Sequence, residues 1–407
     1  MRQPYPGLRA FSREETDLFF GRENCIDTMV ERLAATRFLA VLGSSGSGKS
    51  SLVRTGLLDA LELGWLSSAG SRWAVATMRP AGAPIANLAS ALQKIDGRGT
   101  GDANELELLD AFLRRGPRSV LSWCSEGHLA PRTNLLIVVD QFEELFRFGD
   151  YAGREEAEAF VSLLLESVSG RDLPIYVVLT MRSEFLGACS LVPGLAERIN
   201  QGLYLTPRMT REETREAIIG PAAVCGFDIE PALVNRLLND LAAFAPWEDD
   251  QASDQLRMLS RRADQLPLMQ HVLNRLWLRA RESAGSSRIT LRMAEYELLG
   301  GLGGAIDAHA AEVVAALPTE AARLVERVFR GLVTGSTVAT ALRHPCRFAD
   351  LVDLCEGARD PVVSVVEAFR AAGCNFLMPP PETTLSDETE PPRFCRRLQL
   401  PNRMEPL

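Results

Sequence analysis

A glycine- and serine-rich stretch holds the residues best suited to bind phosphate. Residues 43–50 read GSSGSGKS, which matches the pattern G-x-x-x-x-G-K-[ST]. In this pattern the backbone N–H groups point inward at a phosphate, the lysine reaches the outer phosphate oxygens, and the final hydroxyl is placed to ligate Mg²⁺. We predict phosphate contacts from the following residues: Gly43, Ser44, Ser45, Gly46, Ser47, Gly48, Lys49, Ser50 and Ser51.

Acidic residues follow a buried strand farther along the chain. The apolar run 135–139 ends at Asp140, and a carboxylate there is costly unless it meets a cation or hydrogen-bond donors. We therefore predict that Asp140 and Ser50 together serve Mg²⁺. Glu143 or Glu144 could act as the general base toward water. Both could instead begin a solvated helix, where acidic side chains interact favourably with the helix dipole. If one of them is the base, the sequence does not say which of the two glutamates it is.

An arginine leaves a third apolar run. Residues 175–180 are typical of a buried strand, and Arg182 follows two residues later. Beside a phosphate loop, such a guanidinium would stabilise charge on the outermost phosphate. The alternative is a surface arginine, which is frequent in a chain where nearly all the positive charge is arginine. Lys49 and Lys94 are the only lysines.

The elements that must position these residues alternate in type over residues 1–207. Apolar runs at 38–42, 73–78, 135–139, 175–180 and 202–205 predict strands, and helical patterns such as 155–168 lie between them. The phosphate-loop pattern follows the first strand and precedes a helix over 49–61. This alternation is typical of an α/β domain with a parallel sheet.

The texture changes after residue 207. Thr210 and Glu213 form a capping box that predicts a helix start, and no further strand is expected until about residue 376. We predict a helical domain over 208–299, punctuated by a glycine cluster at 300–304. Helices at 307–316, 319–333, 347–356 and 361–372, followed by a strand at 375–378, predict a winged-helix-like domain over 300–385. Residues 386–407 lack periodicity and are expected to form a disordered tail.

Composition excludes several classes. The chain has 407 residues, enough for two or three domains. It has no apolar run long enough for a membrane span and no secretory signal at its start, so we expect a cytoplasmic location. The eight cysteines include no CxxC pair, which argues against a disulfide framework or a zinc ribbon. A net charge of −9 disfavours a sequence-independent grip on nucleic acid.

The order of these motifs resembles the STAND NTPases, signal-transduction ATPases with numerous domains, and is most similar to the bacterial novel STAND NTPase domain. The resemblance covers about residues 4–385, and the number and order of its motifs make it specific. The matching stretches are residues 5–11, 18–23, 43–50, 138–146, 180–185, 266–271 and 300–304.

The resemblance implies an AAA-like P-loop sheet, then a helical lid and a partial winged helix. It implies that Arg22 contacts the nucleotide near the adenine, that Arg182 reads the γ-phosphate and that Pro267 packs on the base. The chain departs from the family pattern after Ser386, where a strand carrying a histidine is usual. We expect a switch core without the usual effector and sensor repeats.

The leading hypothesis is a switch in bacterial signalling or defence that binds ATP or ADP with Mg²⁺ and hydrolyses ATP slowly. Its expected partners are nucleotide, further copies of the chain or an effector protein, and neither membrane nor nucleic acid. The alternative is a nucleic-acid-associated initiator or remodelling ATPase, which can also carry a winged helix. Against it, residues 318–407 contain 11 arginines and 12 acidic residues. A small-molecule kinase would need an acceptor site, for which no motif is present.

Overall fold

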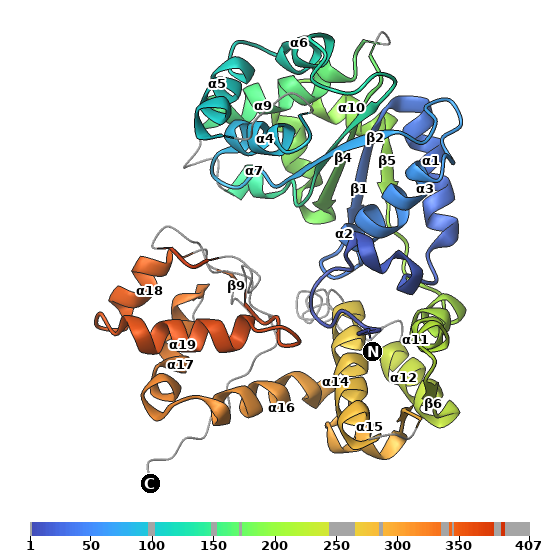
Figure 1. The fold of residues 1–407 in the computed structure, drawn as a ribbon, viewed down its shortest axis with the longest axis vertical. Coiled ribbons are helices and arrows are strands. Elements are labelled where there is room, and N and C mark those ends of the chain that lie inside the picture. Colours follow the sequence, from blue (N-terminus) through green and yellow to red (C-terminus); the bar gives the residue numbers. More distant parts are fainter. Residues whose placement is uncertain are drawn as a thin grey trace, which may run out of the picture. The chain divides into compact units, whose positions relative to one another are not determined.

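The computed structural model describes residues 2–96, 102–147, 153–170, 173–243, 265–284, 288–334, 342–343, 346–377 and 384–386. The chain forms two compact units (Figure 1). We call Phe11–Glu213 the sheet unit, and Met1–Ala10 together with Thr214–Leu407 the helical unit. The domain boundaries predicted within the second half of the chain remain predictions, and residues 387–407 of the predicted tail lie outside the described residues.

A five-stranded parallel sheet forms the centre of the sheet unit. Its strand order is β2-β3-β4-β1-β5. The predicted α/β fold class and all five predicted strands are confirmed, because continuous apolar runs are what a strand covered on both faces requires. The strands are β1 (Phe38–Gly43), β2 (Trp73–Met78), β3 (Asn134–Val139), β4 (Ile175–Arg182) and β5 (Leu203–Leu205).

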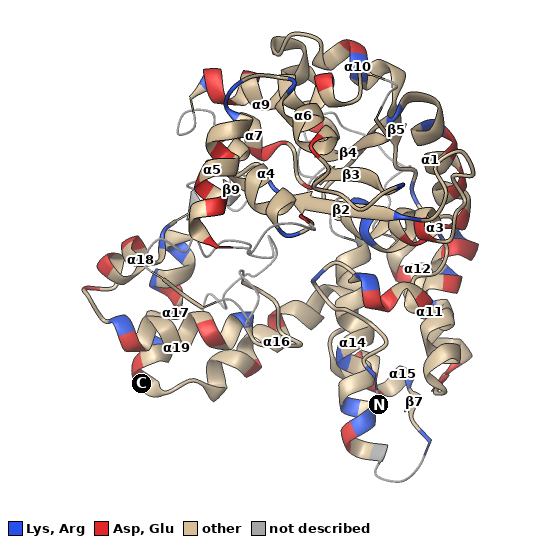
Figure 2. Ribbon diagram, turned by 45° about the horizontal axis from the view of Figure 1, so that its top comes forward, with Lys and Arg blue, Asp and Glu red and all other residues tan. Residues whose placement is uncertain are grey.

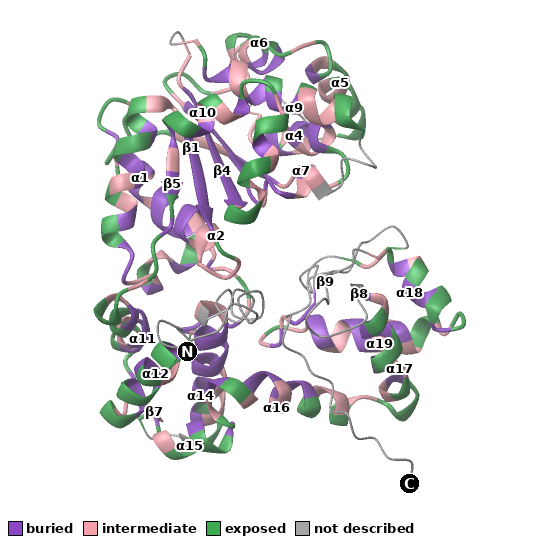
Figure 3. Cartoon of the chain, turned by 180° about the vertical axis from the view of Figure 1, so that it is seen from behind, coloured by how far each residue is buried: buried purple, intermediate pink, exposed green. Residues whose placement is uncertain are grey.

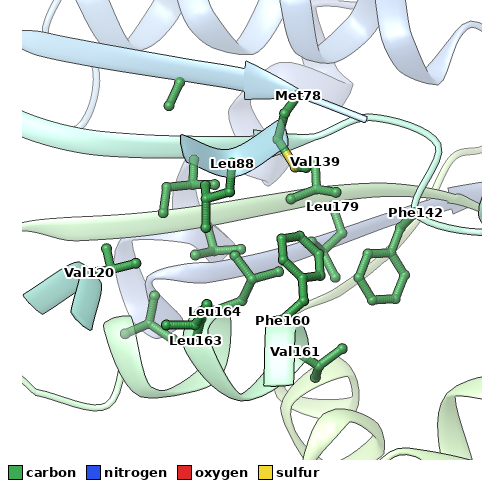
Figure 4. Close-up of a cluster of buried hydrophobic side chains, with 14 of the residues drawn as sticks. Met78, Leu88, Val120, Val139, Phe142, Phe160, Val161, Leu163, Leu164 and Leu179 are labelled. Atoms are coloured by element: carbon green, nitrogen blue, oxygen red, sulfur yellow. The ribbon is translucent and has the colours of Figure 1, made fainter. Parts of the chain in front are cut away.

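Helices cover both faces of this sheet. Alternate residues of each strand enter two separate cores, as the two-residue period of a strand requires. Figure 4 shows the larger core, where Phe160 and Leu164 of α9 lie near Val139 of β3 and Leu179 of β4. The helical elements of the unit are η1 (Arg13–Leu18), α1 (Glu23–Thr36), α2 (Lys49–Ser51), η2 (Leu52–Leu57), α3 (Leu58–Glu62), α4 (Pro84–Gln93), α5 (Ala103–Leu113), α6 (Ser119–Ser125), α7 (Glu144–Arg147), α9 (Arg154–Ser167), η3 (Ser183–Leu191) and α10 (Leu195–Gln201).

The buried strands position the residues of the predicted site. In Figure 3, β1 and β4 are buried along their length, so their carboxyl ends are held firmly. The helix after β1 is α-helical at Lys49–Ser51 and Leu58–Glu62 but π-helical over η2. The predicted helix at 49–61 is therefore present with an irregular centre.

The helical unit consists mainly of helices, and the first of its long helices begins at the end of the sheet unit. The predicted capping box is confirmed: the Thr210 amide donates to the Glu213 carboxylate (2.6 Å), and the Glu213 amide donates to the Thr210 hydroxyl (3.2 Å). The helix that begins there, α11, crosses the division between the units. The helices are α11 (Arg211–Cys225), α12 (Pro231–Ala243), α14 (Gln265–Ala284), α15 (Met293–Leu298), α16 (Gly301–Ala316), α17 (Thr319–Gly331), α18 (Phe348–Leu354) and α19 (Arg359–Arg370).

Two strand predictions for this part of the chain were wrong. Short strands do occur before residue 376, in the pairs β6 (Asp228–Ile229) with β7 (Thr290–Leu291) and β8 (Val333–Thr334) with β9 (Leu342–Arg343). Residues 375–377 form no strand, because the Phe376 and Leu377 amides both donate to the Phe369 carbonyl at the end of α19. Met378 lies outside the described residues.

No helix in the described part of the chain is both long and apolar enough to cross a bilayer.

Candidate functional site

The predicted site residues meet at the carboxyl edge of the sheet. In the register of the parallel strands, Gly43 at the end of β1 lies opposite Arg182 at the end of β4. Val139 of β3 lies opposite Leu179 of β4, so Asp140 and Thr180 emerge side by side. Ligands of open α/β sheets bind at this edge, where the strand order reverses.

The loop after β1 has the shape of a phosphate cradle. Gly46 and Gly48 have φ values of +72° and +86°, which favour glycine, and Gly48 caps the helix that follows. The Lys49 ammonium donates to the carbonyls of Gly43 (2.9 Å) and Ser44 (2.7 Å). Burial lowers the pKa of Lys49 to about 8. These two hydrogen bonds hold the ammonium against the loop, at the place where phosphates would bind.

The Asp140 carboxylate is the centre of the hydrogen-bond network at this edge. Its Oδ1 accepts from the hydroxyls of Ser50 (2.7 Å) and Thr180 (2.6 Å), and its Oδ2 accepts from Arg54 (2.9 Å). A second guanidinium, that of Arg79, lies 3.7 Å from Oδ2. Burial alone would raise the pKa of Asp140, but these two charges and two hydroxyls hold it below its ordinary value. The carboxylate is therefore ionised although only 1% of the side chain is exposed.

These groups fit the ligands predicted for them. A hydroxyl and a carboxylate 2.7 Å apart offer the hard oxygen donors that Mg²⁺ prefers, and a helix N-terminus behind a glycine-rich loop is a site for phosphate. Among the described residues, no group of three or more His, Cys, Asp or Glu side chains is placed to hold a metal ion.

Glu143 and Glu144 lie in different environments. Glu143 is 5% exposed. Its carboxylate pairs with the Arg182 guanidinium (Nε to Oε1, 3.2 Å) and accepts from the Arg182 amide (3.4 Å). Its charge also acts on Lys49. Glu144 begins α7, and its amide donates to the Gln141 carbonyl. The structure thus brings Glu143, Arg182 and Lys49 together.

Three further predicted ligands have definite surroundings. Arg22 is 4% exposed and donates to the carbonyls of Ser47 (3.2 Å) and Pro207 (2.8 Å), so it braces the phosphate loop. The Ser51 hydroxyl accepts from the Phe11 amide (3.1 Å). Pro267 lies in the first turn of α14, in the other unit. Nucleotide contacts by these three residues remain predictions.

Sequence reasoning missed Arg54, Arg79 and Thr180. A signal was present for each of the two arginines. Arg54 follows Ser50 by four residues, the spacing that puts two side chains on one helix face. Arg79 directly follows β2, as Asp140 follows β3, and the last residues of those strands are paired. Using these signals required the sheet order, which places β2 and β4 on either side of β3.

Comparison with known proteins gives one family and several distant structures. The model of the family described as novel STAND NTPase 1 matches residues 4–377. No curated protein matches the chain. Similar solved structures include the ORC1 protein of Aeropyrum pernix in complex with DNA: 17% identity, 88% of this chain and 85% of that chain covered, TM-score 0.46.

Two others are the Walker-type ATPase Paby2304 of Pyrococcus abyssi and Cdc6p from Pyrobaculum aerophilum. For the ATPase, identity is 15%, coverage is 91% of this chain and 93% of that chain, and the TM-score is 0.43. For Cdc6p, identity is 15%, coverage is 91% and 90%, and the TM-score is 0.40. Likenesses at this level say nothing about ligand or activity.

Proposed function

The chain belongs to the novel STAND NTPase 1 family, and from that premise we propose that it is a switch that binds ATP and hydrolyses it slowly in bacterial signalling or defence. The observation that carries this proposal is the meeting of Ser50 and Asp140 at 2.7 Å beside the Lys49 ammonium. A hydroxyl, a buried carboxylate and a cation at the mouth of a phosphate loop are the groups that hold nucleotide and Mg²⁺ in P-loop proteins.

Each group has a role toward ATP. The loop amides and Lys49 would hold the β- and γ-phosphates, while Ser50 and Asp140 would hold Mg²⁺, which screens charge on the phosphates when bound. Glu143 would take a proton from the attacking water. Arg182 would stabilise the γ-phosphate.

The pairing of Glu143 with Arg182 supports slow turnover. Oε1 of Glu143 lies 3.2 Å from Nε of Arg182, so the attacking water would have to compete with the guanidinium for this oxygen. Arg182 cannot give its Nε–H to Glu143 and to a phosphate at the same time. The other N–H groups of Arg182 can still reach a phosphate, so it is the access of water to Glu143 that this pair limits.

The charge pattern favours a protein partner over nucleic acid. Figure 2 shows acidic and basic residues interspersed on helices of both units. In the helical unit, several arginines are paired with acidic side chains, including Arg330 with Glu326 and Arg327 with Glu356. Such neutralised arginines release few counterions on binding phosphates. Salt-dependent retention on immobilised duplex DNA would instead favour the initiator alternative.

The test compares the two lysines of the chain. Lys49→Ala should weaken ATP binding about 10²-fold, because it removes a charge-assisted contact to phosphate worth up to about 3 kcal/mol. Lys94→Ala is the matched control, since this exposed lysine follows the last residue of α4. Calorimetric titration of both variants and the wild type with ATP and Mg²⁺ gives the affinities. Equal affinities in all three proteins would contradict the proposal.

A further inference from the structure

Two arginines reach the carboxylate that the proposed function reserves for Mg²⁺. Arg54 comes from η2 and Arg79 from the end of β2. Their terminal nitrogens lie 2.9 Å and 3.7 Å from the same oxygen, Oδ2 of Asp140. One buried negative charge therefore faces two positive charges.

The two oxygens of Asp140 differ in what they allow. Oδ1 accepts hydrogen bonds from the hydroxyls of Ser50 and Thr180. A hydroxyl that donates a hydrogen bond to a carboxylate still presents a lone pair to a cation, so these bonds are compatible with Mg²⁺. The Arg54 contact at Oδ2 is not, because it brings a positive charge to the oxygen that a hydrated divalent cation would use.

The local backbone holds Arg54 at this place. Arg54 lies in the π-helical segment. Such segments are rare in proteins as a whole, but those that occur are often found at functional sites. Thr55 and Gly56 beside it are fully buried or nearly so. A Cβ at Gly56 would lie 2.6 Å from Cδ1 of Ile26 in α1, so this segment packs closely against α1. The side chain of Arg54 is nevertheless 33% exposed, which leaves the guanidinium a route toward solvent.

Both guanidinium groups are also incompletely bonded. The Nε–H groups of Arg54 and Arg79 are buried without a hydrogen-bond partner among the described residues. A buried donor without a partner costs free energy. Leaving Asp140 is therefore less costly for these side chains than leaving a fully satisfied ion pair.

We propose that Arg54, supported by Arg79, competes with Mg²⁺ for Asp140 and so sets the Mg²⁺ concentration at which the nucleotide complex forms its metal site. This inference rests on the proposed function. For Mg²⁺ to bind, the Arg54 guanidinium must leave Oδ2 and turn outward. Arg54 is a positioning residue that controls access to the metal site, and it is distinct from the groups that contact the phosphates.

The experiment measures metal binding without activity. Mn²⁺ is titrated into the complex of the full chain with ADP and followed by electron paramagnetic resonance. In Arg54→Gln the dissociation constant for Mn²⁺ should fall about tenfold, because binding no longer breaks a charge-assisted hydrogen bond. Arg79→Gln should give a smaller decrease, since its nitrogen is farther from Oδ2 and the Arg54 pair remains to stabilise the fold.

The control is Arg114→Gln, which removes an exposed arginine paired with Asp110 and Glu156 in the same unit. This variant should bind Mn²⁺ as the wild type does. Unchanged or weaker Mn²⁺ binding in folded Arg54→Gln, or in Arg79→Gln if the first variant does not fold, would overturn the inference. Titration of the wild type with ADP in the presence of a chelator separates the two levels. Failure to bind ADP there would contradict the proposed function itself.

Discussion

Glu143 and Glu144 are neighbours in sequence, but Glu143 is buried and Glu144 is only half-buried. The Glu143 carboxylate pairs with Arg182 and acts on Lys49. We predict that Glu143→Gln slows ATP hydrolysis by about 10²–10⁴-fold, the usual contribution of a general base, while ATP binding persists. Phosphate release in a single turnover, with binding measured separately, gives both quantities.

Glu144→Gln is the control for this prediction, because it makes the same chemical change one residue later. Its rate should stay close to that of the wild type. A slow Glu144→Gln beside a normal Glu143→Gln would reverse the assignment. Two normal variants would remove both glutamates from the mechanism.

The limits of prediction from sequence are clear at this scale. Lys49, Ser50, Asp140 and Arg182 could be predicted as site residues because each stands at a fixed place next to a strand or loop. Arg79 was missed because its role depends on which strands are neighbours, and Arg54 was missed because its spacing from Ser50 does not by itself show which residue that helix face meets. The sequence predicts strands but not their order, and it is the order that brings β2 and its Arg79 to the side of Asp140.

At the scale of elements, two buried histidines lie between α14 and α16. His271 and His309 stack with ring centroids 5.2 Å apart, and Phe376 packs on both. Both nitrogens of His271, and Nδ1 of His309, lack a hydrogen-bond partner in the described part of the chain. Burial, the neighbouring imidazole and Arg275 lower the pKa of His271 to about 3. Burial, Arg275 and Arg279 do the same for His309.

This pair should make the helical unit sensitive to acid. The folded pKa values of about 3 lie below the unfolded value of about 6.5. The unfolded chain therefore binds more protons, and stability that is complete above about pH 6.5 decreases as the pH falls toward 3. Each histidine contributes about 1.4 kcal/mol per pH unit in that range.

Urea unfolding of the wild type and of His309→Phe between pH 7.5 and 5 measures this effect. The variant keeps an aromatic ring beside His271 and Phe376 but removes one titrating group. The free energy of unfolding should therefore depend less steeply on pH in the variant, by about one proton. Identical slopes for the two proteins would show that His309 takes up its proton equally in the folded state.

Elements were predicted well where both faces of a strand, or the whole apolar side of a helix, are buried. The strands of the large sheet and most helices were of this kind. The pairs β6–β7 and β8–β9 were missed because a strand of two residues has no period to detect. Residues 376–377 are apolar, as a strand would be. Phe376 instead packs on the two stacked histidines, and the amides of Phe376 and Leu377 donate to a carbonyl at the end of α19.

At the scale of the whole molecule, Pro267 tests whether nucleotide acts on both units. All the site residues described above belong to the sheet unit, whereas Pro267 belongs to the helical unit. If Pro267 packs on the base, as the family implies, ADP should protect amides of residues 265–270 from hydrogen exchange as well as those of residues 43–51. Exchange measured by mass spectrometry with and without ADP makes the comparison directly.

Pro267→Ala should abolish that protection and weaken ADP binding by about tenfold, because apolar contact worth roughly 1.5 kcal/mol would be lost. Pro231→Ala is a suitable control, since Pro231 is the exposed first residue of α12. ADP-dependent protection restricted to residues of the sheet unit would show that α14 does not take part in binding.

The N-terminal segment of the helical unit affects the order in which the protein is completed during synthesis. Gln3 and Tyr5 are synthesised before the sheet unit, but they bond to Asn274 and Ile218, which follow 271 and 213 residues later. At about 5–20 residues per second, Gln3 and Tyr5 wait roughly 10–50 s for their partners. The whole sheet unit emerges during that interval, so it can fold while Gln3 and Tyr5 are still without these partners. The helical unit is completed after the sheet unit, around a segment that was made before it.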